Sequence, residues 1–287
     1  MRSLALIGIA LSASSFAQSP RYFIEPVGYP QTTHGEAFVR GGVVGGSYSD
    51  GWVRSFLRAS DGSLVPLGQA QSGLGTWLFG VAGDGTGAGG SSKAIEGHTV
   101  PVRWNAAGVL SELPTTSSRP LGIVFGRAAG GHSAGMIHTA AWTDNNDQMR
   151  RAAYWSPAGT LTVIDLFNRG IAWDVNSKGW ATGFIDFPGF SSQAFLWKGG
   201  SPQRIVVDAQ HQWAVGQGIN EWGEVTGLYR TPDNKHHVFV ASGTVGSGKG
   251  SPVGYVHAEG DAINDAGVVA GRMFTTDFEY VNSYGMV

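Results

Sequence analysis

The chain contains no cysteine, and only 14% of its 287 residues are charged. The absence of cysteine excludes disulfide bonds, thiolate metal sites and cysteine nucleophiles. The formal net charge is −2, and no run of lysine or arginine offers a surface to a phosphate backbone. The sequence therefore predicts a protein held together by packing alone, without nucleic acid as a partner.

Glycine, by contrast, is abundant, with 45 residues, and proline adds another 12. Together they exceed the usual share of these two residue types and leave little room for long helices. Hydrophobic residues nevertheless reach 42% and aromatic residues 11%, which is enough to bury a core. This composition indicates an all-β protein.

The N-terminus has the pattern of a secretory signal peptide. Arg2 is followed by an apolar stretch, and Ser15 and Ala17 place small side chains where a signal peptidase cleaves. The apolar stretch is shorter than the ~20 residues that a membrane-spanning helix needs. We therefore expect a signal peptide over 1–17, a mature domain over 18–287 without a membrane span, and an extracellular or periplasmic location.

A ten-residue pattern recurs six times along the chain. Its copies end at glycines 46, 89, 131, 183, 227 and 271, spaced by 43, 42, 52, 44 and 44 residues. The clearest copy, residues 262–271, holds Asn264-Asp265-Ala266-Gly267, a sequence typical of a tight turn between two strands. Each copy therefore predicts a β-hairpin, and the long third interval predicts an inserted loop within 132–149.

An aromatic and apolar strand and a short closing strand follow each hairpin, as at Ala194-Phe195-Leu196-Trp197. Four strands in about 44 residues are typical of a propeller blade. We expect a single β-propeller of six four-stranded blades, whose last blade has its third strand at 278–281 and is completed by a strand at 22–27. A seven-bladed propeller and a truncated open array are the alternatives.

These repeats resemble the HAF repeat family, a group of bacterial extracellular proteins. The likeness rests on Ile263-Asn264-Asp265-Ala266-Gly267-Val268-Val269-Ala270-Gly271, on the matching residues 219–227, and on Ala194-Phe195-Leu196-Trp197. It is degenerate in the first three copies, where the asparagine is replaced. The resemblance implies export and a propeller-like fold, and it implies no shared catalytic residue.

Two tryptophans are candidates for ligand binding. Trp104, Trp155 and Trp197 recur at one place in the repeat, which favours packing between blades. Trp222 instead occupies a hairpin tip, and Trp52 precedes a strand in a glycine-rich loop. Exposed aromatic rings at such places stack on sugars or anchor a protein partner.

Acidic residues offer weaker candidates for a metal or for catalysis. Asp144 and Asp147 lie in the predicted insertion and provide oxygen ligands for Ca²⁺, although a solvated turn is the simpler interpretation. The adjacent His236 and His237 are expected on opposite faces of a strand, where they do not share a metal. We expect no other cofactor.

The functional hypothesis is an exported binding or scaffold module for a glycan or a cell-surface protein, without catalysis. A glycan-active hydrolase or lyase is the first alternative, because Asp174 and Asp261 lie near first strands of the blades, where side chains can face a central channel. A structural envelope or matrix protein is the second alternative.

Overall fold

The computed structural model describes residues 7–9, 24–26, 35–40, 43–49, 53–58, 62–93, 98–116, 121–139, 149–207, 211, 213–250, 256–274 and 283–286. These residues form β-strands and one 3₁₀ turn, η1 (Ala129–Gly131), with no α-helix among them. In this part of the chain no helix is long and apolar enough to cross a membrane. The all-β prediction is confirmed.

The chain divides into two compact units, residues 1–113 and 114–287. Unit 1 contains a two-stranded sheet of β1 (Ile7–Ile9) and β2 (Ile24–Pro26) and two four-stranded antiparallel sheets. Sheet 1 consists of β3 (Gly35–Arg40), β4 (Val43–Ser49), β5 (Val53–Arg58) and β6 (Leu64–Pro66). Sheet 2 consists of β7 (Thr76–Val81), β8 (Gly87–Lys93), β9 (His98–Trp104) and β10 (Leu110–Glu112).

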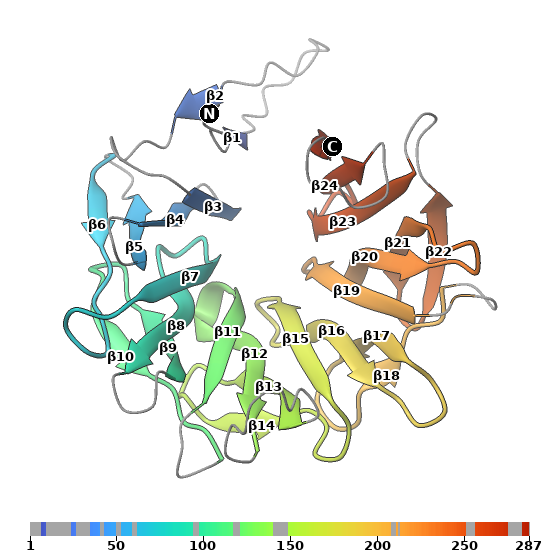
Figure 1. The fold of residues 1–287 in the computed structure, drawn as a ribbon, viewed down its shortest axis with the longest axis horizontal. Helices are drawn as coiled ribbons and strands as arrows, with labels where there is room; N and C mark the ends of the chain where they lie inside the picture. The colour runs from blue at the N-terminus through green and yellow to red at the C-terminus, as the bar shows by residue number, and fades with distance from the viewer. Residues whose placement is uncertain are drawn as a thin grey trace. The chain divides into compact units, whose positions relative to one another are not determined.

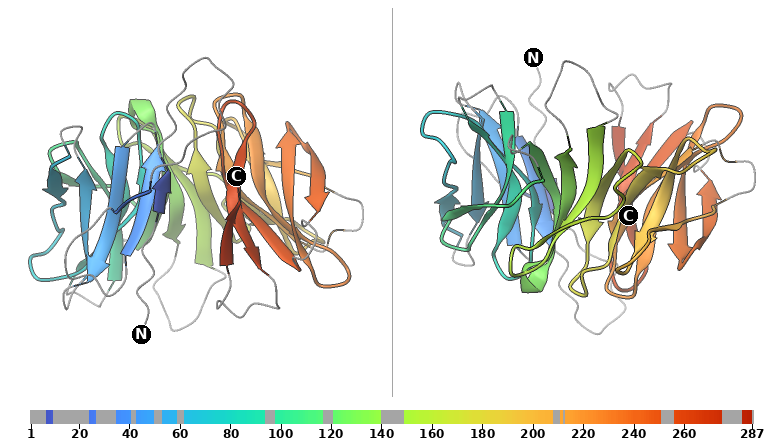
Figure 2. Two further views of the ribbon diagram at one scale, coloured as in Figure 1. Left: turned by 90° about the horizontal axis from the view of Figure 1, so that it is seen from above. Right: turned by 90° about the horizontal axis from the view of Figure 1, so that it is seen from below.

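Unit 2 contains four sheets in chain order. Sheet 3 is β11 (Gly122–Arg127), β12 (Ser133–His138), β13 (Arg150–Trp155) and β14 (Leu161–Val163); sheet 4 is β15 (Gly170–Val175), β16 (Ala181–Asp186), β17 (Ser192–Trp197) and β18 (Gln203–Arg204). Sheet 5 is β19 (Trp213–Ile219), β20 (Glu224–Arg230), β21 (His236–Ser242) and β22 (Val245–Gly250); sheet 6 is β23 (His257–Ile263), β24 (Val269–Phe274) and β25 (Ser283–Met286). Figures 1 and 2 show this succession of antiparallel sheets.

The first strands of the four sheets in unit 2, β11, β15, β19 and β23, lie next to one another along one side of the unit (Figure 1). The apolar core lies between successive sheets and not within a single one. One cluster joins residues of sheets 3 and 4, including the buried Ile164 and Phe195, and another joins sheets 4 and 5, including Leu196 and Phe239. Each sheet of the unit covers the apolar face of its neighbour, as the repeat predicts.

A β-bulge recurs in the first strand of sheets 2 to 6, where one residue has no partner on the second strand. A closing glycine stands opposite the bulge. A Cβ added to Gly183 would lie 1.9 Å from the carbonyl oxygen of Ile171, and one added to Gly227 would lie 1.9 Å from that of Val215. The repeated glycines are therefore required because the bulged strand brings its backbone so close.

The third copy of the repeat needs a correction. Gly135, and not Gly131, stands opposite the third bulge, beside Val124. Gly131 lies in the turn between β11 and β12 of the same hairpin, with φ +95°. The predicted loop over 132–149 was wrong in its first part, because Ser133–His138 form β12. The register slipped by four residues because two glycines of this copy serve different purposes.

The last copy is also shifted. β25 pairs with β24 as the third strand of sheet 6, with Met286 opposite Gly271. The third strand was expected at 278–281, which lie outside the described residues. β2, which was expected to complete this sheet, pairs with β1; closure by residues 22–27 stays a prediction, as does the signal peptide over 1–17.

The repeated tryptophans lie in the core as predicted. Trp104 and Trp155 are fully buried, and Trp197 is 5% exposed. The indole nitrogen Nε1 of Trp104 donates to the carbonyl oxygen of Gly68, and that of Trp155 donates to Pro114, each at 2.8 Å. Gly68 lies in the segment that follows sheet 1, so the hydrogen bond of Trp104 ties the two four-stranded sheets of unit 1 together. Pro114 lies at the start of unit 2, so the hydrogen bond of Trp155 is made within that unit.

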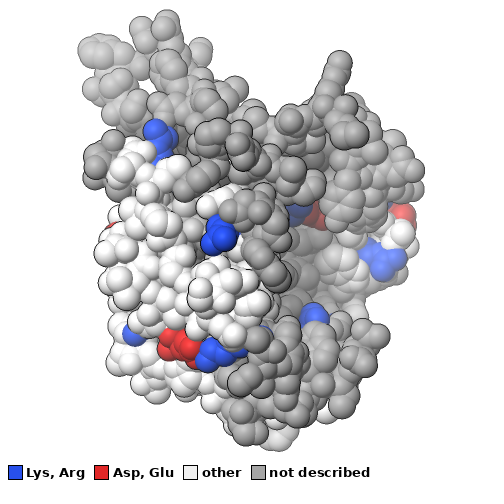
Figure 3. Space-filling view, turned by 60° about the vertical axis from the view of Figure 1, so that its left-hand side comes forward, with Lys and Arg blue, Asp and Glu red and all other residues white. Residues whose placement is uncertain are grey.

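Lysine, arginine, aspartate and glutamate make up only 14% of the chain. Figure 3 shows one face of the molecule, on which the lysines and arginines of the described residues are scattered and largely surrounded by uncharged side chains. In the described part of unit 1, an ion pair joins Lys93 Nζ to Glu112 Oε2 at 2.7 Å. An exposed pair of this kind contributes little to stability.

Candidate functional site

The hairpin that carries Trp222 is organised by Asn220. The side-chain oxygen Oδ1 of Asn220 accepts hydrogen bonds from the backbone N–H groups of Trp222 at 3.0 Å and Glu224 at 2.9 Å. Gly223 completes the turn with φ +82°, a conformation that glycine adopts without strain. This confirms the predicted turn role of the repeated asparagine, and it places Trp222 at the tip.

The same asparagines also link neighbouring sheets. Asn176 Nδ2 donates to the carbonyl oxygen of Asn220 at 2.9 Å, and Asn220 Nδ2 donates to that of Asn264 at 3.0 Å. Asn176, Asn220 and Asn264 thus form a ladder across sheets 4, 5 and 6. The sequence interpretation missed this second role, although the 44-residue spacing of the three asparagines was a signal for it.

The ring of Trp222 is exposed and held in place. Trp222 is 67% exposed, yet its Nε1 donates to the carbonyl oxygen of Asp265 at 3.0 Å. The backbone N–H of Glu221 donates to Asp265 Oδ1 at 2.8 Å, which fixes the two turns against each other. The side chain predicted as a ligand-binding candidate is therefore a fixed aromatic group on the surface.

Two lysines and a second tryptophan surround Trp222. Lys178 Nζ lies 5.6 Å from the centroid of the Trp222 ring and 4.9 Å from that of Trp180, and it donates to the carbonyl oxygen of Glu221 at 2.7 Å. Lys198 Nζ lies 3.9 Å from the Trp180 centroid. We call this group the tip surface; it consists of Lys178, Trp180, Lys198, Glu221, Trp222 and Asp265.

Close packing of the turns shapes the tip surface. A Cβ added to Gly223 would lie 2.8 Å from two carbons of the Trp180 ring, so only glycine allows the turn of sheet 5 to rest on this ring. The backbone N–H and the hydroxyl of Ser177 both donate to the carboxylate of Glu221. Sequence reasoning found Trp222 alone, because Lys178 and Lys198 come from two different turns of sheet 4.

A histidine and a tyrosine occupy the corresponding place at sheet 3. His132 Nδ1 and the Tyr154 hydroxyl are 2.6 Å apart, and both lie under the turn residue Gly179. Burial lowers the pKa of His132, and the positive charge of Arg127 lowers it further. Burial also raises the pKa of Tyr154. The neutral forms of both side chains are therefore favoured here.

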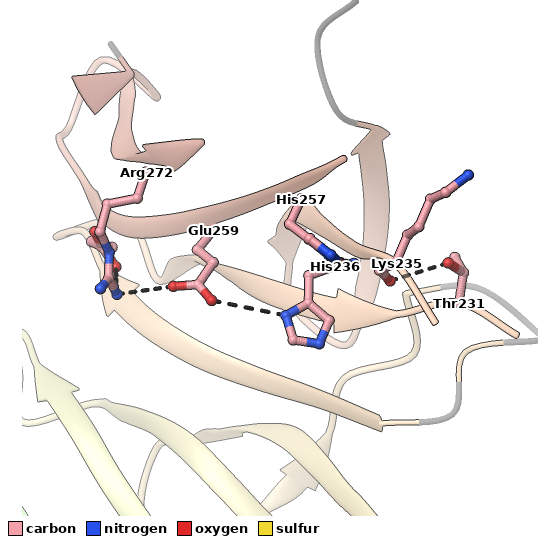
Figure 4. A network of polar contacts seen from close by, with 7 residues as sticks. Thr231, Lys235, His236, His257, Glu259 and Arg272 are labelled. Atoms are coloured by element: carbon pink, nitrogen blue, oxygen red, sulfur yellow. Dashed lines mark hydrogen bonds and ion pairs between the residues drawn. The ribbon is translucent and has the colours of Figure 1, made fainter. Parts of the chain in front are cut away.

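A second polar group lies between sheets 5 and 6 and is shown in Figure 4. Arg272 pairs with Glu259 at 2.9 Å and with both oxygens of Asp261 at 2.9 and 3.0 Å. Glu259 Oε1 lies 3.8 Å from His236 Nδ1, and the backbone N–H of His236 donates to His257 Nδ1 at 3.0 Å. Burial raises the pKa of Asp261, and Arg272 opposes that rise.

The two aspartates named as channel candidates have different surroundings. Asp174 accepts hydrogen bonds from the backbone N–H of Val175 at 2.8 Å and of Ile219 at 3.1 Å, the second across to sheet 5. Asp261 is held by Arg272. The structure therefore does not bring Asp174 and Asp261 together as a pair of unengaged carboxylates.

The other candidates lie outside the described residues. These are Trp52 and the proposed calcium ligands Asp144 and Asp147, so calcium binding there stays a prediction.

His236 is buried beside His257, whereas His237 lies against the ring of Tyr229, which agrees with opposite faces of the strand. Within the described ranges, no group of three or more His, Asp and Glu residues is arranged to hold a metal ion.

Comparison with known proteins identifies no relative. No family model matches the chain, and no curated protein matches it. Function is therefore inferred from the tip surface and from the first strands of the sheets.

Proposed function

We propose that this protein is an exported binding module, built as a β-propeller, that holds a protein partner at the cell surface through the tip surface. The proposed export relies on the signal-like residues 1–17. The proposed propeller is supported by the repeat of antiparallel four-stranded sheets and by the apolar clusters between successive sheets.

The observation that carries the proposal is the exposure of Trp222 in a fixed orientation. A tryptophan that is 67% exposed leaves a large apolar area in water, while the hydrogen bond to Asp265 holds the ring in place. A partner that covers this ring gains apolar contact without the entropy cost of ordering it. Tryptophan is also among the residues that most often dominate the energy of protein interfaces.

The surroundings of Trp222 favour a protein over a sugar at this place. Lys178, Lys198, Glu221 and Asp265 surround the two rings with charges of both signs, as in the polar rim of a protein interface. The ammonium groups of Lys178 and Lys198 already contact the Trp180 ring, so less of this ring is available for a pyranose to stack on.

The hydrolase alternative needs an acid and a base placed on either side of a glycosidic bond. Asp261 and Glu259 share Arg272, and Asp174 holds two backbone N–H groups. These carboxylates are engaged in holding strands together, which supports binding over hydrolysis.

The test is retention of envelope proteins by the immobilised mature protein, followed by affinity measurement with the purified partner. Loss of an interface tryptophan should weaken binding by roughly thirtyfold. Phe167→Ala is the matched control, because Phe167 is 87% exposed and lies on the turn between β14 and β15. Equal binding by wild type and Trp222→Ala would refute the proposal.

The proposed ring closure has a separate test. Small-angle X-ray scattering of the mature protein distinguishes a closed ring from an open arc of sheets. A profile that fits only an open arc would contradict the propeller and would leave the proposal for the tip surface standing.

A further inference from the structure

The recurrent bulge inserts one extra residue into each affected first strand. The residue without a partner on the second strand is in turn Phe79, Phe125, Trp173, Gln217 and Asp261. The opposing glycine accommodates the bulge whatever the inserted side chain is. The inserted residue is aromatic in sheets 2, 3 and 4 and polar in sheets 5 and 6.

Four of these residues belong to unit 2, and their strands are neighbours. β11, β15, β19 and β23 lie next to one another, so Phe125, Trp173, Gln217 and Asp261 follow one another from strand to strand. The ring centroids of Phe125 and Trp173 are 4.4 Å apart. With its amide nitrogen turned toward sheet 6, Gln217 donates to Asp261 Oδ1 at 3.3 Å and to the carbonyl oxygen of Gly260 at 3.0 Å.

We call these four residues the inner row. Each of the four is partly exposed, and Arg272 extends the row through its two hydrogen bonds to Asp261. Figure 4 shows Arg272 reaching from β24 toward β23, where Glu259 is its second carboxylate partner. One end of the row is thus aromatic, and the other end carries an amide, a carboxylate and a guanidinium.

An unmatched donor lies in the middle of the row. Trp173 Nε1 is buried and has no hydrogen-bond partner among the described residues. A buried indole N–H usually finds an acceptor, because leaving it unpaired costs free energy. This donor is satisfied if the ring turns so that its N–H faces an oxygen of a molecule bound on the row.

We propose that the inner row binds an uncharged oligosaccharide chain. The apolar faces of sugar rings stack on aromatic rings such as Phe125 and Trp173, and sugar hydroxyls supply an acceptor for Trp173 Nε1. Gln217, Asp261 and Arg272 offer the planar donors and acceptors that bind adjacent hydroxyls. Because Arg272 faces two carboxylates, Asp261 and Glu259, the row has an excess of negative charge that disfavours an anionic glycan.

The probes are hexasaccharides of β-1,4-linked glucose, β-1,4-linked N-acetylglucosamine and α-1,4-linked glucose, with a hexamer of galacturonate as the anionic comparison. Calorimetry and tryptophan fluorescence on the full mature protein measure binding. We expect at least one neutral hexasaccharide to bind and the galacturonate hexamer not to bind. Trp173→Ala should weaken binding at least about tenfold, and Gln217→Ala should also weaken it.

Trp173→Phe separates the two contributions of the indole. It keeps an aromatic face and removes the N–H, so its affinity should lie between those of wild type and Trp173→Ala. Circular dichroism and the melting temperature verify that each variant folds. If Trp173→Ala does not fold, Gln217→Ala and Trp173→Phe carry the test.

Trp222→Ala is the control that separates this inference from the proposed function. It should lose the protein partner and bind the sugar as wild type does. The inference is overturned if none of the neutral hexasaccharides binds, if the galacturonate hexamer binds more tightly, or if variants of the inner row bind as wild type does. A peptide ligand on the inner row would likewise overturn it.

Discussion

The asparagine ladder makes a quantitative prediction about stability. Asn176 is fully buried and makes three hydrogen bonds: it donates to the carbonyl oxygen of Asn220 and accepts from the N–H groups of Lys178 and Trp180. At about 1 kcal/mol for each bond, Asn176→Ala should lower the free energy of unfolding by about 3 kcal/mol.

Asn264→Ala is the matched variant. Asn264 is exposed, and its Oδ1 accepts from the N–H groups of Ala266 at 3.0 Å and Val268 at 2.9 Å. Water can replace those bonds, so this change should cost only about 1 kcal/mol. The two losses in the free energy of unfolding should differ by about 2 kcal/mol. This difference measures the effect of burying the Asn176 side chain together with its hydrogen bond to the next sheet.

Sheet 3 supports this division of roles. Ala128 occupies the place of Asn176 in that sheet, and the turn keeps its backbone hydrogen bonds, with Ala128 N–H donating to the His132 carbonyl oxygen at 3.0 Å. The turn therefore forms without asparagine. In addition, the asparagine side chain accepts hydrogen bonds from two N–H groups inside the turn and donates one to the neighbouring sheet.

The assay is urea unfolding followed by circular dichroism. With a slope of about 3 kcal/mol per molar urea for a chain of this size, Asn176→Ala should lower the midpoint by about 1 M. The midpoint of Asn264→Ala should fall by about a third of that amount. Equal midpoints for the two variants would refute the claim that the ladder stabilises the contact between sheets.

Two further predictions concern other parts of unit 2. Gly183→Ala should lower the free energy of unfolding by about 3 kcal/mol or more, because its Cβ would lie 1.9 Å from the Ile171 carbonyl oxygen; Gly199→Ala, which has φ +90° but open space around it, should cost about 1 kcal/mol in the same denaturation assay. His132 has a pKa below its usual value in the folded protein, so as the pH falls the unfolded protein takes up a proton at this residue before the folded protein does. The free energy of unfolding should therefore decrease as the pH drops below about 6.5. The melting temperature of His132→Gln should therefore fall less between pH 7 and pH 5 than that of wild type, and equal falls would contradict this.

The repeat could be predicted from the sequence because the backbone geometry of each sheet requires certain residue types at certain positions. Gly183, Gly227 and Gly271 each stand opposite a bulge, and Asn220 and Asn264 each organise a turn, so these residues recur and reveal the period. In sheet 3, Ala128 replaces the asparagine and both Gly131 and Gly135 are present, so the register was misread.

The candidate sites were harder to predict for the opposite reason. Phe125, Trp173, Gln217 and Asp261 share a structural position, but two of them are aromatic and two are polar, so no recurring residue type marks them. A bulge also changes the count of residues along a strand without leaving a sequence signal. Trp222 could be singled out, because a tryptophan at a hairpin tip has no sheet to pack into.

The repeat therefore separates the residues that stabilise from the residues that are able to bind. The glycine opposite each bulge and the turn asparagine of sheets 4, 5 and 6 stabilise one backbone arrangement from sheet to sheet, and replacing them disturbs that arrangement. The inserted residue of the bulge and the second residue after the turn asparagine, which is Lys178, Trp222 or Ala266, vary freely within it. Because variation at these two positions leaves the sheets intact, they are the places where a repeat of this kind acquires specificity for a ligand.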